Sequence, residues 1–401
     1  ELRSYQLEGW AWLTRLSMWG AGACLADDMG LGKTIQALAV LAQRGARGPQ
    51  IVIAPTSVVG NWRRETARFA PDLRAVVYRE GDRREILARL GPGDLLLASY
   101  GILVRDAEAL SSIAWTTLVL DEAQAVKNAD TQRAKAARGL NADWRLALTG
   151  TPIENHLGEL WSLFDLVSPG LLGKEREFKE RFITPIERSK DSERRLALAR
   201  LVRPFVLRRT KSEVARDLPP RTEMTLEVEL SSAEAQLYED ARRAAVARVG
   251  GLVTESEQSR FQVLAEIMRL RQLACHPRLV YPDETATSSK METALALIDT
   301  LRREGHRALV FSQFTRHLAL LRAALDEAKV PYLYLDGSTP ALEREKRVER
   351  FQAGEGELFL ISLKAGGTGL NLTGADYVIH LDPWWNPAVE DQATDRAHRI
   401  G

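Results

Sequence analysis

Short apolar runs recur along both halves of the chain, and each is followed by a polar loop and a stretch with helical spacing. The runs do not alternate with polar residues, which is typical of strands buried on both faces of a parallel sheet. Stretches such as 34–44 and 291–304 have the pattern of crossover helices. The pattern therefore predicts two α/β domains, with strands at 51–54, 95–98, 117–120 and 145–148 and then at 308–311, 332–335, 358–361 and 377–381.

The middle of the chain, roughly 153–290, has a different pattern. It is rich in Leu, Ala, Arg and Glu at helical spacing, and only 223–230 is strand-like. We interpret this region as mostly helical material inserted between the two sheets. Residues 200–221 hold seven basic and two acidic side chains, and Pro219-Pro220 then interrupts the helical pattern, so we expect the linker between the halves here. Residues 283–289 are predicted to form an exposed loop.

Composition and charge exclude several classes of protein. The chain has 401 residues, of which 45% are hydrophobic and 27% charged, as in a well-packed protein of two to four domains. The formal net charge of +1 excludes a wholly basic nucleic-acid binder but allows a local basic face. We expect no transmembrane helix and no signal peptide. Since the chain begins at Glu1 and stops at Gly401 within a predicted helix, we expect it to be part of a longer protein.

The cysteine content gives a separate constraint. Cys24 and Cys275 are the only two cysteines. Two cysteines exclude a disulfide framework and a cysteine-rich zinc site. A reducing, intracellular compartment fits this composition.

A glycine-rich segment at 25–34, LADDMGLGKT, lies between an apolar run and a helical stretch. Its glycines allow the backbone to approach a phosphate, Lys33 can reach the β- and γ-phosphates, and the Thr34 hydroxyl can ligate Mg²⁺. The helix that follows presents its N-terminus to the anion. Asp27 stands where the usual P-loop pattern has glycine, so the match to the general pattern is imperfect.

A second segment, TLVLDEAQ at 117–124, is an apolar strand that ends in two carboxylates. Such carboxylates lie at the carboxyl edge of a parallel sheet, where α/β proteins bind ligands. Asp121 can hold Mg²⁺ and Glu122 can orient an attacking water. A solvated acidic loop would have the same pattern, but its combination with Lys33 favours an ATPase.

A third segment, LTGTP at 148–152, also follows a predicted strand. The hydroxyls of Thr149 and Thr151 can bond to the acidic pair and to the backbone, and so could sense the state of a nucleotide. The alternative is an ordinary turn built with Gly150 and Pro152.

A fourth segment, QATDRAHR at 392–399, has helical spacing. Gln392, Arg396 and Arg399 lie at i, i+4 and i+7, on one face of the helix. Two arginines on one face can reach a phosphoryl group held on another domain and stabilise charge in the transition state. A solvated basic helix face is the alternative.

In this order the four segments resemble the motifs of superfamily-two helicases, and further blocks narrow the resemblance to the SWI/SNF (sucrose-nonfermenting) family of DNA-dependent ATPases. Two blocks in the middle region are specific to that family, and ordinary strand-separating helicases lack them. The resemblance covers essentially the whole chain. Besides the P-loop, its blocks are LRSYQLEGW at 2–10, LDEAQAVKN at 120–128, LTGTPIEN at 148–155, LRRTKSEVARDLP at 207–219, LRQLACHP at 270–277, LVFSQFT at 309–315, LDGST at 335–339, SLKAGGTGLNLTGAD at 362–376, DPWWNP at 382–387 and DQATDRAHRIG at 391–401.

The resemblance implies an α/β fold of two RecA-like lobes with parallel sheets. Lobe 1 would span 1–222 with a helical insertion at about 155–215, and lobe 2 would span 223–401 with an insertion at about 231–285 and without the family's usual C-terminal tail. It implies ATP and Mg²⁺ as cofactors and non-specific double-stranded DNA as partner. We expect a monomer without membrane attachment, cytoplasmic and nucleoid-associated if the source is prokaryotic.

The activity implied is ATP-driven translocation on double-stranded DNA, which displaces or remodels DNA-bound proteins without strand separation. A strand-separating helicase or an RNA-directed remodeller is the alternative enzyme. A nucleotide-dependent scaffold without catalysis is the alternative of another class. The protein target stays open.

The resemblance also assigns roles to individual residues. Catalysis falls to Lys33, Asp121, Glu122 and the finger arginines Arg396 and Arg399, with Thr34 and Asp121 as ligands of Mg²⁺. Gln6 resembles the adenine-reading glutamine. The other expected nucleotide contacts are Asp28, Met29, Gly30, Gly32, Lys33, Thr34 and Gln392, the coupling residues are Gln124, Thr149 and Thr151, and the expected nucleic-acid contacts are Thr56, Ser57, Ser99, Tyr100, Ser312, Gln313, Ser338, Thr339, Lys364, Gly366, Gly367 and Thr368.

The sequence departs from the family's more usual residues at Gln124 and within 362–364, and its two tryptophans at 384 and 385 allow two interpretations. Gln124 stands where eukaryotic members more often have histidine, which leaves the acidic pair intact but bears on its coupling to Thr149 and Thr151. The stretch 362–364 is Ser-Leu-Lys where many members have Ser-Thr-Arg. Trp384 and Trp385 either pack at a sheet edge or contact DNA.

Overall fold

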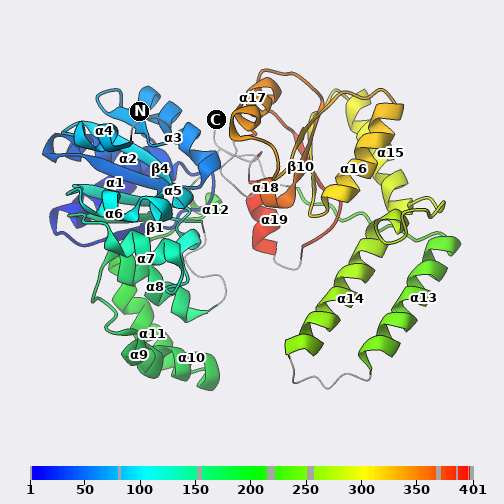
Figure 1. Cartoon of the computed structure of the whole chain (residues 1–401), viewed down its shortest axis with the longest axis horizontal. Coiled ribbons are helices and arrows are strands. Elements are labelled where there is room, and N and C mark those ends of the chain that lie inside the picture. Colours follow the sequence, from blue (N-terminus) through cyan, green and yellow to red (C-terminus); the bar gives the residue numbers. More distant parts are fainter. Residues whose placement is uncertain are drawn as a thin grey trace. The chain divides into compact units, whose positions relative to one another are not determined.

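The computed structural model describes residues 2–79, 83–150, 156–214, 222–250, 257–366, 372–384, 387–395 and 397, with the backbone alone at 257–258, 341, 387–389 and 392. The chain divides into two compact units, Glu1–Pro219 and Pro220–Arg399, which we call lobe 1 and lobe 2. This division falls three residues before the boundary expected from the sequence. Figure 1 shows the helices and strands of both lobes.

Lobe 1 is built on a seven-stranded parallel sheet in the order β3-β4-β2-β5-β6-β1-β7. The four strands predicted in this half of the chain are confirmed. Three short strands were not predicted, and one of them, β7, is contributed by the far end of the lobe. The strands are β1 (Ala23–Leu25), β2 (Gln50–Ala54), β3 (Arg74–Val77), β4 (Asp94–Ser99), β5 (Thr117–Asp121), β6 (Arg145–Leu148) and β7 (Val206–Leu207).

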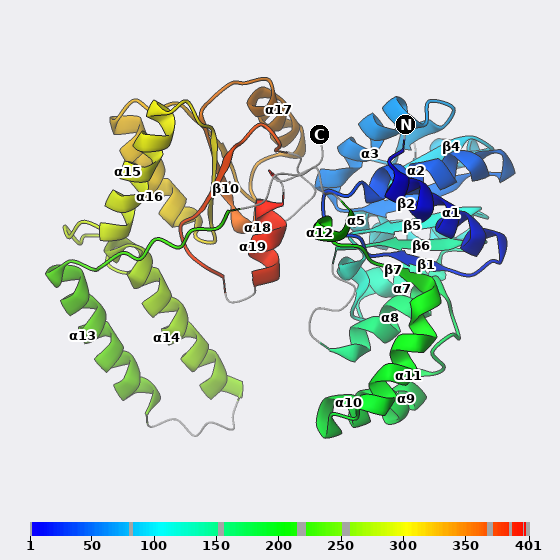
Figure 2. The same ribbon diagram turned by 180° about the vertical axis from the view of Figure 1, so that it is seen from behind.

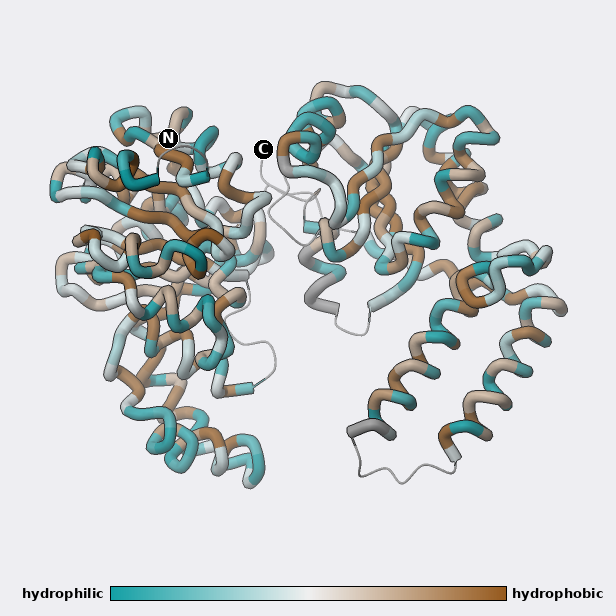
Figure 3. The backbone as a smooth tube through the Cα atoms, in the orientation of Figure 1, coloured by the Kyte–Doolittle hydropathy of each residue, from teal (hydrophilic) through white to brown (hydrophobic). Residues whose placement is uncertain are grey.

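The sheet of lobe 1 separates two hydrophobic cores. Within β2, Ile51 and Ile53 belong to one core, whereas Val52 and Ala54 belong to the other. Burial of both faces explains why the strands are continuous apolar runs, which appear as a hydrophobic band in Figure 3. The covering helices are α1 (Ser4–Met18), α2 (Lys33–Arg44) and α3 (Thr56–Phe69) on one face and α5 (Tyr100–Arg105), α6 (Ala107–Ser111), α7 (Gln132–Gly139) and α8 (Leu157–Val167) on the other, with α4 (Arg83–Ala88) after β3.

The helical insertion of lobe 1 ends by returning to the sheet. Its helices lie together at the end of the lobe opposite α3, as both views show (Figure 2). The chain then forms β7, which pairs with β1 through Cys24–Val206 and Leu25–Leu207. This pairing places the residues after Leu207 beside the residues after Leu25. The elements are α9 (Glu175–Phe178), a π-helical turn (Lys179–Ile183), α10 (Thr184–Ser189), α11 (Ser192–Val202) and, after β7, α12 (Lys211–Val214).

Lobe 2 is built on a four-stranded parallel sheet in the order β11-β8-β10-β9. All four strands predicted in this half are confirmed, and the sheet again has a core on each face. The strands are β8 (Ala308–Ser312), β9 (Tyr332–Leu335), β10 (Leu358–Ser362) and β11 (Tyr377–His380). The helices α15 (Ser289–Arg303) and α16 (Thr315–Glu327) cover one face, and α17 (Ala341–Gln352), α18 (Leu363–Gly366) and α19 (Pro387–Thr394) cover the other.

Two long helices, α13 (Ser232–Val249) and α14 (Glu257–Cys275), form the insertion of lobe 2 and extend away from its sheet (Figure 1). Ser231 caps α13, and the Glu234 carboxylate accepts from the backbone N–H groups of both Ser231 and Ser289, which ties the insertion to α15. The strand predicted at 223–230 is wrong. These residues form no strand and are mostly exposed. No helix in the described ranges combines the length and the apolar composition needed to cross a membrane.

Candidate active site

Three segments with predicted chemistry leave the sheet of lobe 1 at one edge. Leu25 at the end of β1 pairs with Leu148 at the end of β6, and Leu148 pairs with Asp121 at the end of β5. Because adjacent strands are about 4.8 Å apart, two spacings separate Leu25 from Asp121 by roughly 10 Å. The P-loop, the acidic pair and the LTGTP segment therefore begin beside one another.

The P-loop has a backbone that only glycine readily adopts. Gly30 and Gly32 have φ values of 88° and 77°. A side chain at Gly32 would also meet the Gln6 amide, since a Cβ atom there would lie 2.6 Å from Gln6 Nε2. Helix α2 begins directly after it at Lys33, so the N–H groups of its first turn, which have no acceptor within the helix, face the loop. The Lys33 ammonium donates to the Asp27 carbonyl oxygen at 2.6 Å.

The Asp121 carboxylate is buried and held from two sides. Trp62 Nε1 donates to its Oδ2 at 2.8 Å, and the Glu122 N–H donates to its Oδ1 at 2.9 Å. Burial and the negative charge of Glu122 raise the pKa of Asp121 to about 7, and the positive charge of Lys33 opposes this shift. A bound cation would favour the ionised form, as expected of a metal ligand.

Glu122 is positioned by its backbone and by one side chain. Its φ of 49° lies in the left-handed region, which is uncommon for a residue other than glycine and is typical of functional sites. Gln124 Nε2 donates to Glu122 Oε2 at 2.8 Å, and the Thr149 hydroxyl donates to Gln124 Oε1 at 3.0 Å. The glutamine thus joins the acidic pair to the LTGTP segment, as a coupling role for Gln124 and Thr149 requires. Thr151 lies outside the described residues.

Two nucleotide residues predicted near the P-loop support it from within the lobe. The Gln6 amide is buried, donates to the Leu31 carbonyl oxygen at 3.3 Å and accepts from the Arg3 N–H at 3.0 Å. Met29 lies against Gly150, where a Cβ atom would be 3.2 Å from the methionine Cγ. Gln6 therefore holds the loop in this structure, and its role in reading adenine stays a prediction.

An ion pair that the sequence did not reveal fixes the start of the P-loop. Asp27, the residue that departs from the general pattern, is 0% exposed. Arg209 forks onto it, with Nη2 2.6 Å from Oδ2 and Nε 3.0 Å from Oδ1, and also donates to Gln36 Oε1 on α2 at 2.8 Å. The only signals in the sequence were the aspartate in place of glycine and the basic LRRTK block.

Backbone contacts strengthen this connection. The Ala26 N–H donates to the Leu207 carbonyl oxygen at 2.7 Å, and the Asp28 N–H donates to that of Arg209 at 2.9 Å. The Lys211 N–H donates in turn to Asp28 Oδ2 at 3.1 Å. The segment that leads toward the end of lobe 1 therefore runs alongside the P-loop.

The nucleic-acid contacts predicted in lobe 1 divide into two groups. Thr56 is exposed and Ser57 is half-buried, and both lie in the first turn of α3, beside the carboxyl edge. Ser99 and Tyr100 are buried instead, and their direct contact with nucleic acid stays a prediction. The Ser99 hydroxyl caps α5, and the Tyr100 hydroxyl donates to the Asp121 carbonyl oxygen at 2.8 Å.

The candidates in lobe 2 also gather at the carboxyl edge of its sheet, because β8, β9 and β10 end in register. Lys364 is exposed on α18, and Ser338 and Thr339 form a turn around the Asp336 carboxylate. Gln313 is half-buried, and its Nε2 has no hydrogen-bond partner among the described residues.

Two residues predicted to contact nucleic acid in lobe 2, Ser312 and Gly366, are packed inside it, and their contact with nucleic acid stays a prediction. Ser312 is buried, and its hydroxyl donates to Asp382. Gly366 is buried against Phe311, where a Cβ atom would lie 2.6 Å from the ring. Gly367, Thr368, Arg396 and Arg399 lie outside the described residues, as does Trp385, and Gln392 is described by its backbone alone.

Trp384 follows the packing alternative. The Arg271 guanidinium lies 5.3 Å from the centre of its indole ring, and Arg271 Nη2 donates to the Pro383 carbonyl oxygen at 2.6 Å. The two sequence blocks LRQLACHP and DPWWNP are therefore in contact, since Arg271 belongs to the first and both partners to the second.

Comparison with known proteins gives the same pattern over the full chain. A family model described as the SNF2-related domain matches residues 5–279, and one described as the helicase conserved C-terminal domain matches residues 289–401. The chain is 44% identical to the putative ATP-dependent helicase/translocase YwqA of Bacillus subtilis and 38% identical to the probable ATP-dependent DNA helicase CHR23 of Arabidopsis thaliana. Both matches include all of this chain, which spans 45% and 40% of those two proteins.

A solved structure has the same fold. The SWI2/SNF2 ATPase core of Sulfolobus solfataricus in complex with dsDNA matches all of this chain and 85% of its own, with 36% sequence identity and a TM-score of 0.54. A second solved structure, the SWI2/SNF2 ATPase core domain of Sulfolobus solfataricus, matches with 34% identity and a TM-score of 0.53. The predicted pair of RecA-like lobes is confirmed.

The raised pKa of Asp121 predicts a pH-dependent affinity for Mg²⁺. Between pH 8 and pH 6 the ionised fraction of a group with a pKa of about 7 falls roughly tenfold, so Mg²⁺-dependent binding of a fluorescent ATP analogue is expected to weaken by about that factor. Protonation of the nucleotide affects every variant equally. Asp121→Asn is the control, and equal pH dependence in the variant and the wild type would contradict the prediction.

Removal of Arg209 is expected to destabilise lobe 1 strongly. Arg209→Ala leaves the buried Asp27 carboxylate without its partner, which costs about 3–5 kcal/mol in the free energy of unfolding measured by chemical denaturation. The exposed neighbour Arg208 gives a matched control. Arg208→Ala is expected to change the free energy of unfolding by less than about 0.5 kcal/mol. Asp27→Asn in the Arg209→Ala background is expected to restore part of the loss. Equal stability of the two arginine variants would refute a structural role for the pair.

Proposed function

Since the chain belongs to the SNF2-related family, we propose that it is the motor of a DNA-dependent ATPase that translocates along double-stranded DNA and displaces or remodels bound proteins. The observation that carries the proposal is the shared sheet edge from which the P-loop, Asp121 and Glu122 emerge, with Gln124 bridging to Thr149. The likeness to an ATPase core bound to dsDNA supports the choice of partner.

ATP hydrolysis uses groups that lobe 1 already positions. The first-turn N–H groups of α2 and the Lys33 ammonium bind the β- and γ-phosphates. Thr34, in the first turn of α2, and the Asp121 carboxylate supply the hard oxygen donors that Mg²⁺ prefers, so these residues fit the ion, which when bound neutralises phosphate charge. A Glu122 carboxylate oxygen orients the attacking water and accepts its proton.

Release of Lys33 accompanies nucleotide binding in this proposal. Its ammonium bonds to the carbonyl oxygens of Asp27 and Asp28 and must turn to the phosphates instead. Asp27 bonds to Lys33 through its carbonyl oxygen and to Arg209 through its carboxylate. The Arg209–Asp27 pair can therefore hold the loop in place while Lys33 turns. We also propose Arg396 and Arg399 as the arginines that stabilise the transferred phosphoryl group.

In this proposal, exposed and half-buried groups at the two carboxyl edges bind DNA. Thr56 and Ser57 in lobe 1 and Ser338, Thr339 and Lys364 in lobe 2 offer hydroxyl, N–H and ammonium donors suited to phosphate oxygens. Contacts of this kind set register and orientation but carry no sequence information. A motor that uses them binds DNA of any sequence.

An ATPase assay tests the proposal directly. Turnover of the full-length protein is measured with duplex DNA, single strands of the same sequence, or RNA, and stimulation by the duplex above the other two is expected. Preferential stimulation by single strands together with strand separation would favour the helicase alternative. Absence of turnover with every nucleic acid, despite ATP binding, would favour a scaffold.

Glu122→Gln is expected to lower the duplex-stimulated kcat by a factor on the order of 10²–10⁴ while ATP still binds, because the water loses its base and the phosphate contacts remain. Glu108→Gln, an exposed carboxylate on α6, is the matched control and is expected to keep the wild-type rate. Hydrolysis by Glu122→Gln at the wild-type rate would remove Glu122 from the mechanism.

Salt dependence tests the mode of DNA binding. If about six phosphates are neutralised, the logarithm of the association constant for duplex DNA is expected to fall against the logarithm of the salt concentration with a slope of roughly −5. The slope is measured by fluorescence anisotropy on two unrelated duplexes, which are expected to give the same affinity. A slope near zero, or a marked preference for one duplex, would contradict a motor that tracks the backbone.

A further inference from the structure

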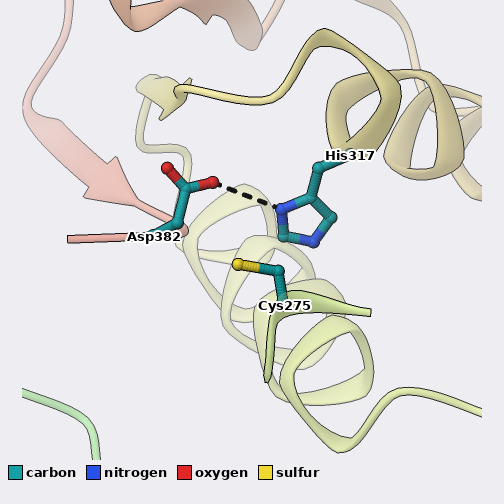
Figure 4. Close-up of side chains that lie close together, drawn as sticks. All are labelled: Cys275, His317 and Asp382. Carbon is teal, nitrogen blue, oxygen red and sulfur yellow. Dashed lines mark hydrogen bonds and ion pairs between the residues drawn. The ribbon is translucent and has the colours of Figure 1, made fainter. Parts of the chain in front are cut away.

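A cysteine, a histidine and an aspartate from three segments that are distant in sequence meet inside lobe 2, just beyond the carboxyl ends of β8 and β11. Cys275 ends α14, His317 lies on α16, and Asp382 follows β11 (Figure 4). Their side chains point toward one another, and one candidate ligand atom from each lies within 4.8 Å of the other two. All three residues are buried, with exposed fractions of 4% for Cys275, 0% for His317 and 3% for Asp382.

The spacing of the histidine and the aspartate suits a shared ion. His317 Nδ1 lies 3.4 Å from Asp382 Oδ2. A charge-assisted hydrogen bond is shorter, at about 2.7–2.9 Å. Two ligands of a tetrahedral ion with bonds of about 2.0 Å are separated by roughly 3.3 Å. The observed distance is therefore long for the hydrogen bond but matches the edge of a zinc coordination sphere.

The cluster also leaves polar atoms unsatisfied. His317 Nε2 is buried and has no hydrogen-bond partner among the described residues. Within the same part of the chain, no hydrogen bond to the Cys275 sulfur occurs, whereas Asp382 accepts from the Gln313 N–H at 2.8 Å and from the Ser312 hydroxyl. Those two donors hold the carboxylate in place, in the way that metal ligands are usually oriented.

We propose that Cys275, His317 and Asp382 bind one divalent transition-metal ion of the Zn²⁺ class. A thiolate, an imidazole and a carboxylate form a mixed ligand set that suits Zn²⁺ or Co²⁺, whereas Mg²⁺ requires oxygen donors. One thiolate and one carboxylate cancel the two charges of the ion, so the buried complex has no net charge. Three protein ligands leave one tetrahedral position for water.

Binding of the ion is coupled to loss of one proton. Burial and the nearby Asp382 raise the pKa of the Cys275 thiol to about 12, so the thiol is neutral at pH 7 in the metal-free protein. The metal–sulfur bond forms as the S–H bond breaks, and the proton passes to solvent.

The ion would cross-link segments that lead to two sequence blocks of the lobe. Cys275 belongs to LRQLACHP, and Asp382 begins DPWWNP, the segment before α19. Arg271 and Trp384 already join these blocks at their surface. Occupancy of the cluster is therefore expected to stabilise lobe 2, independently of nucleotide chemistry in lobe 1.

Cobalt spectroscopy on the full chain tests the site. Chelator-treated protein titrated with Co²⁺ is expected to develop a thiolate-to-cobalt charge-transfer band that saturates at one ion per chain and is abolished by excess Zn²⁺. Cys275→Ala is expected to lose the band. Cys24→Ala removes the other buried cysteine, in β1 of lobe 1, and is expected to keep it. Charge transfer that survives in Cys275→Ala would refute the assignment.

Thermal unfolding provides a measurement that needs no variant. Zn²⁺ is expected to raise the Tm of wild-type lobe 2, while an equal concentration of Mg²⁺ leaves it unchanged, because a ligand that binds only the folded state stabilises it. His317→Gln is expected to weaken Co²⁺ binding on the order of 100-fold. Wild-type protein that shows neither the cobalt band nor a Zn²⁺-dependent rise in Tm contains only a hydrogen-bonded cluster, and the proposal falls.

Discussion

The arrangement of lobe 1 depends on one buried ion pair between Arg209 and Asp27. This pair joins the P-loop, near the start of the lobe's sequence, to the segment after β7, near its end. A carboxylate that is 0% exposed requires a partner of opposite charge, and Arg209 supplies it with two parallel bonds. The pair fixes the P-loop to β7 and hence to the segment that leads out of the lobe. Aspartate in place of the usual glycine thus makes the phosphate-binding loop part of a connection across 182 residues of sequence.

The sequence predicted what depends on local pattern. Eight strands were found because burial on both faces makes each a continuous apolar run, and the P-loop and acidic pair were found because their chemistry needs particular residues in a short order. Strands β1 and β7 were missed because they have only three and two residues. Their hydrogen bonds to neighbouring strands, and not a local sequence pattern, define them as strands. Residues 223–230 have strand-like composition, but composition alone supplies no partner strand.

The orientation of side chains within the motifs could not be predicted in the same way. Tyr100 and Ser312 stand in motifs associated with nucleic acid, yet their hydroxyls bond to Asp121 and Asp382 inside the lobes. A hydroxyl is equally suited to a phosphate oxygen and to a carboxyl or carbonyl oxygen. The choice depends on which face of the sheet edge the residue occupies, and that follows from packing around residues more than 20 positions away.

Two buried side chains, Trp62 and Tyr100, lie between the proposed DNA contacts of lobe 1 and its proposed ATP site. Trp62 on α3 donates to the Asp121 carboxylate, and Tyr100 at the start of α5 donates to the Asp121 carbonyl oxygen. Helix α3 begins at Thr56, where lobe 1 offers its exposed donors for phosphate. A shift of α3 on DNA would move the Trp62 N–H, one of two donors that stabilise ionised Asp121 against burial and the Glu122 charge. Because the Trp62 bond opposes the upward shift in the pKa of Asp121, loss of that bond would raise this pKa further and disfavour the ionised form that binds Mg²⁺. In the proposed mechanism, Trp62 is therefore the shortest connection between the DNA contacts of α3 and the Mg²⁺ ligand Asp121.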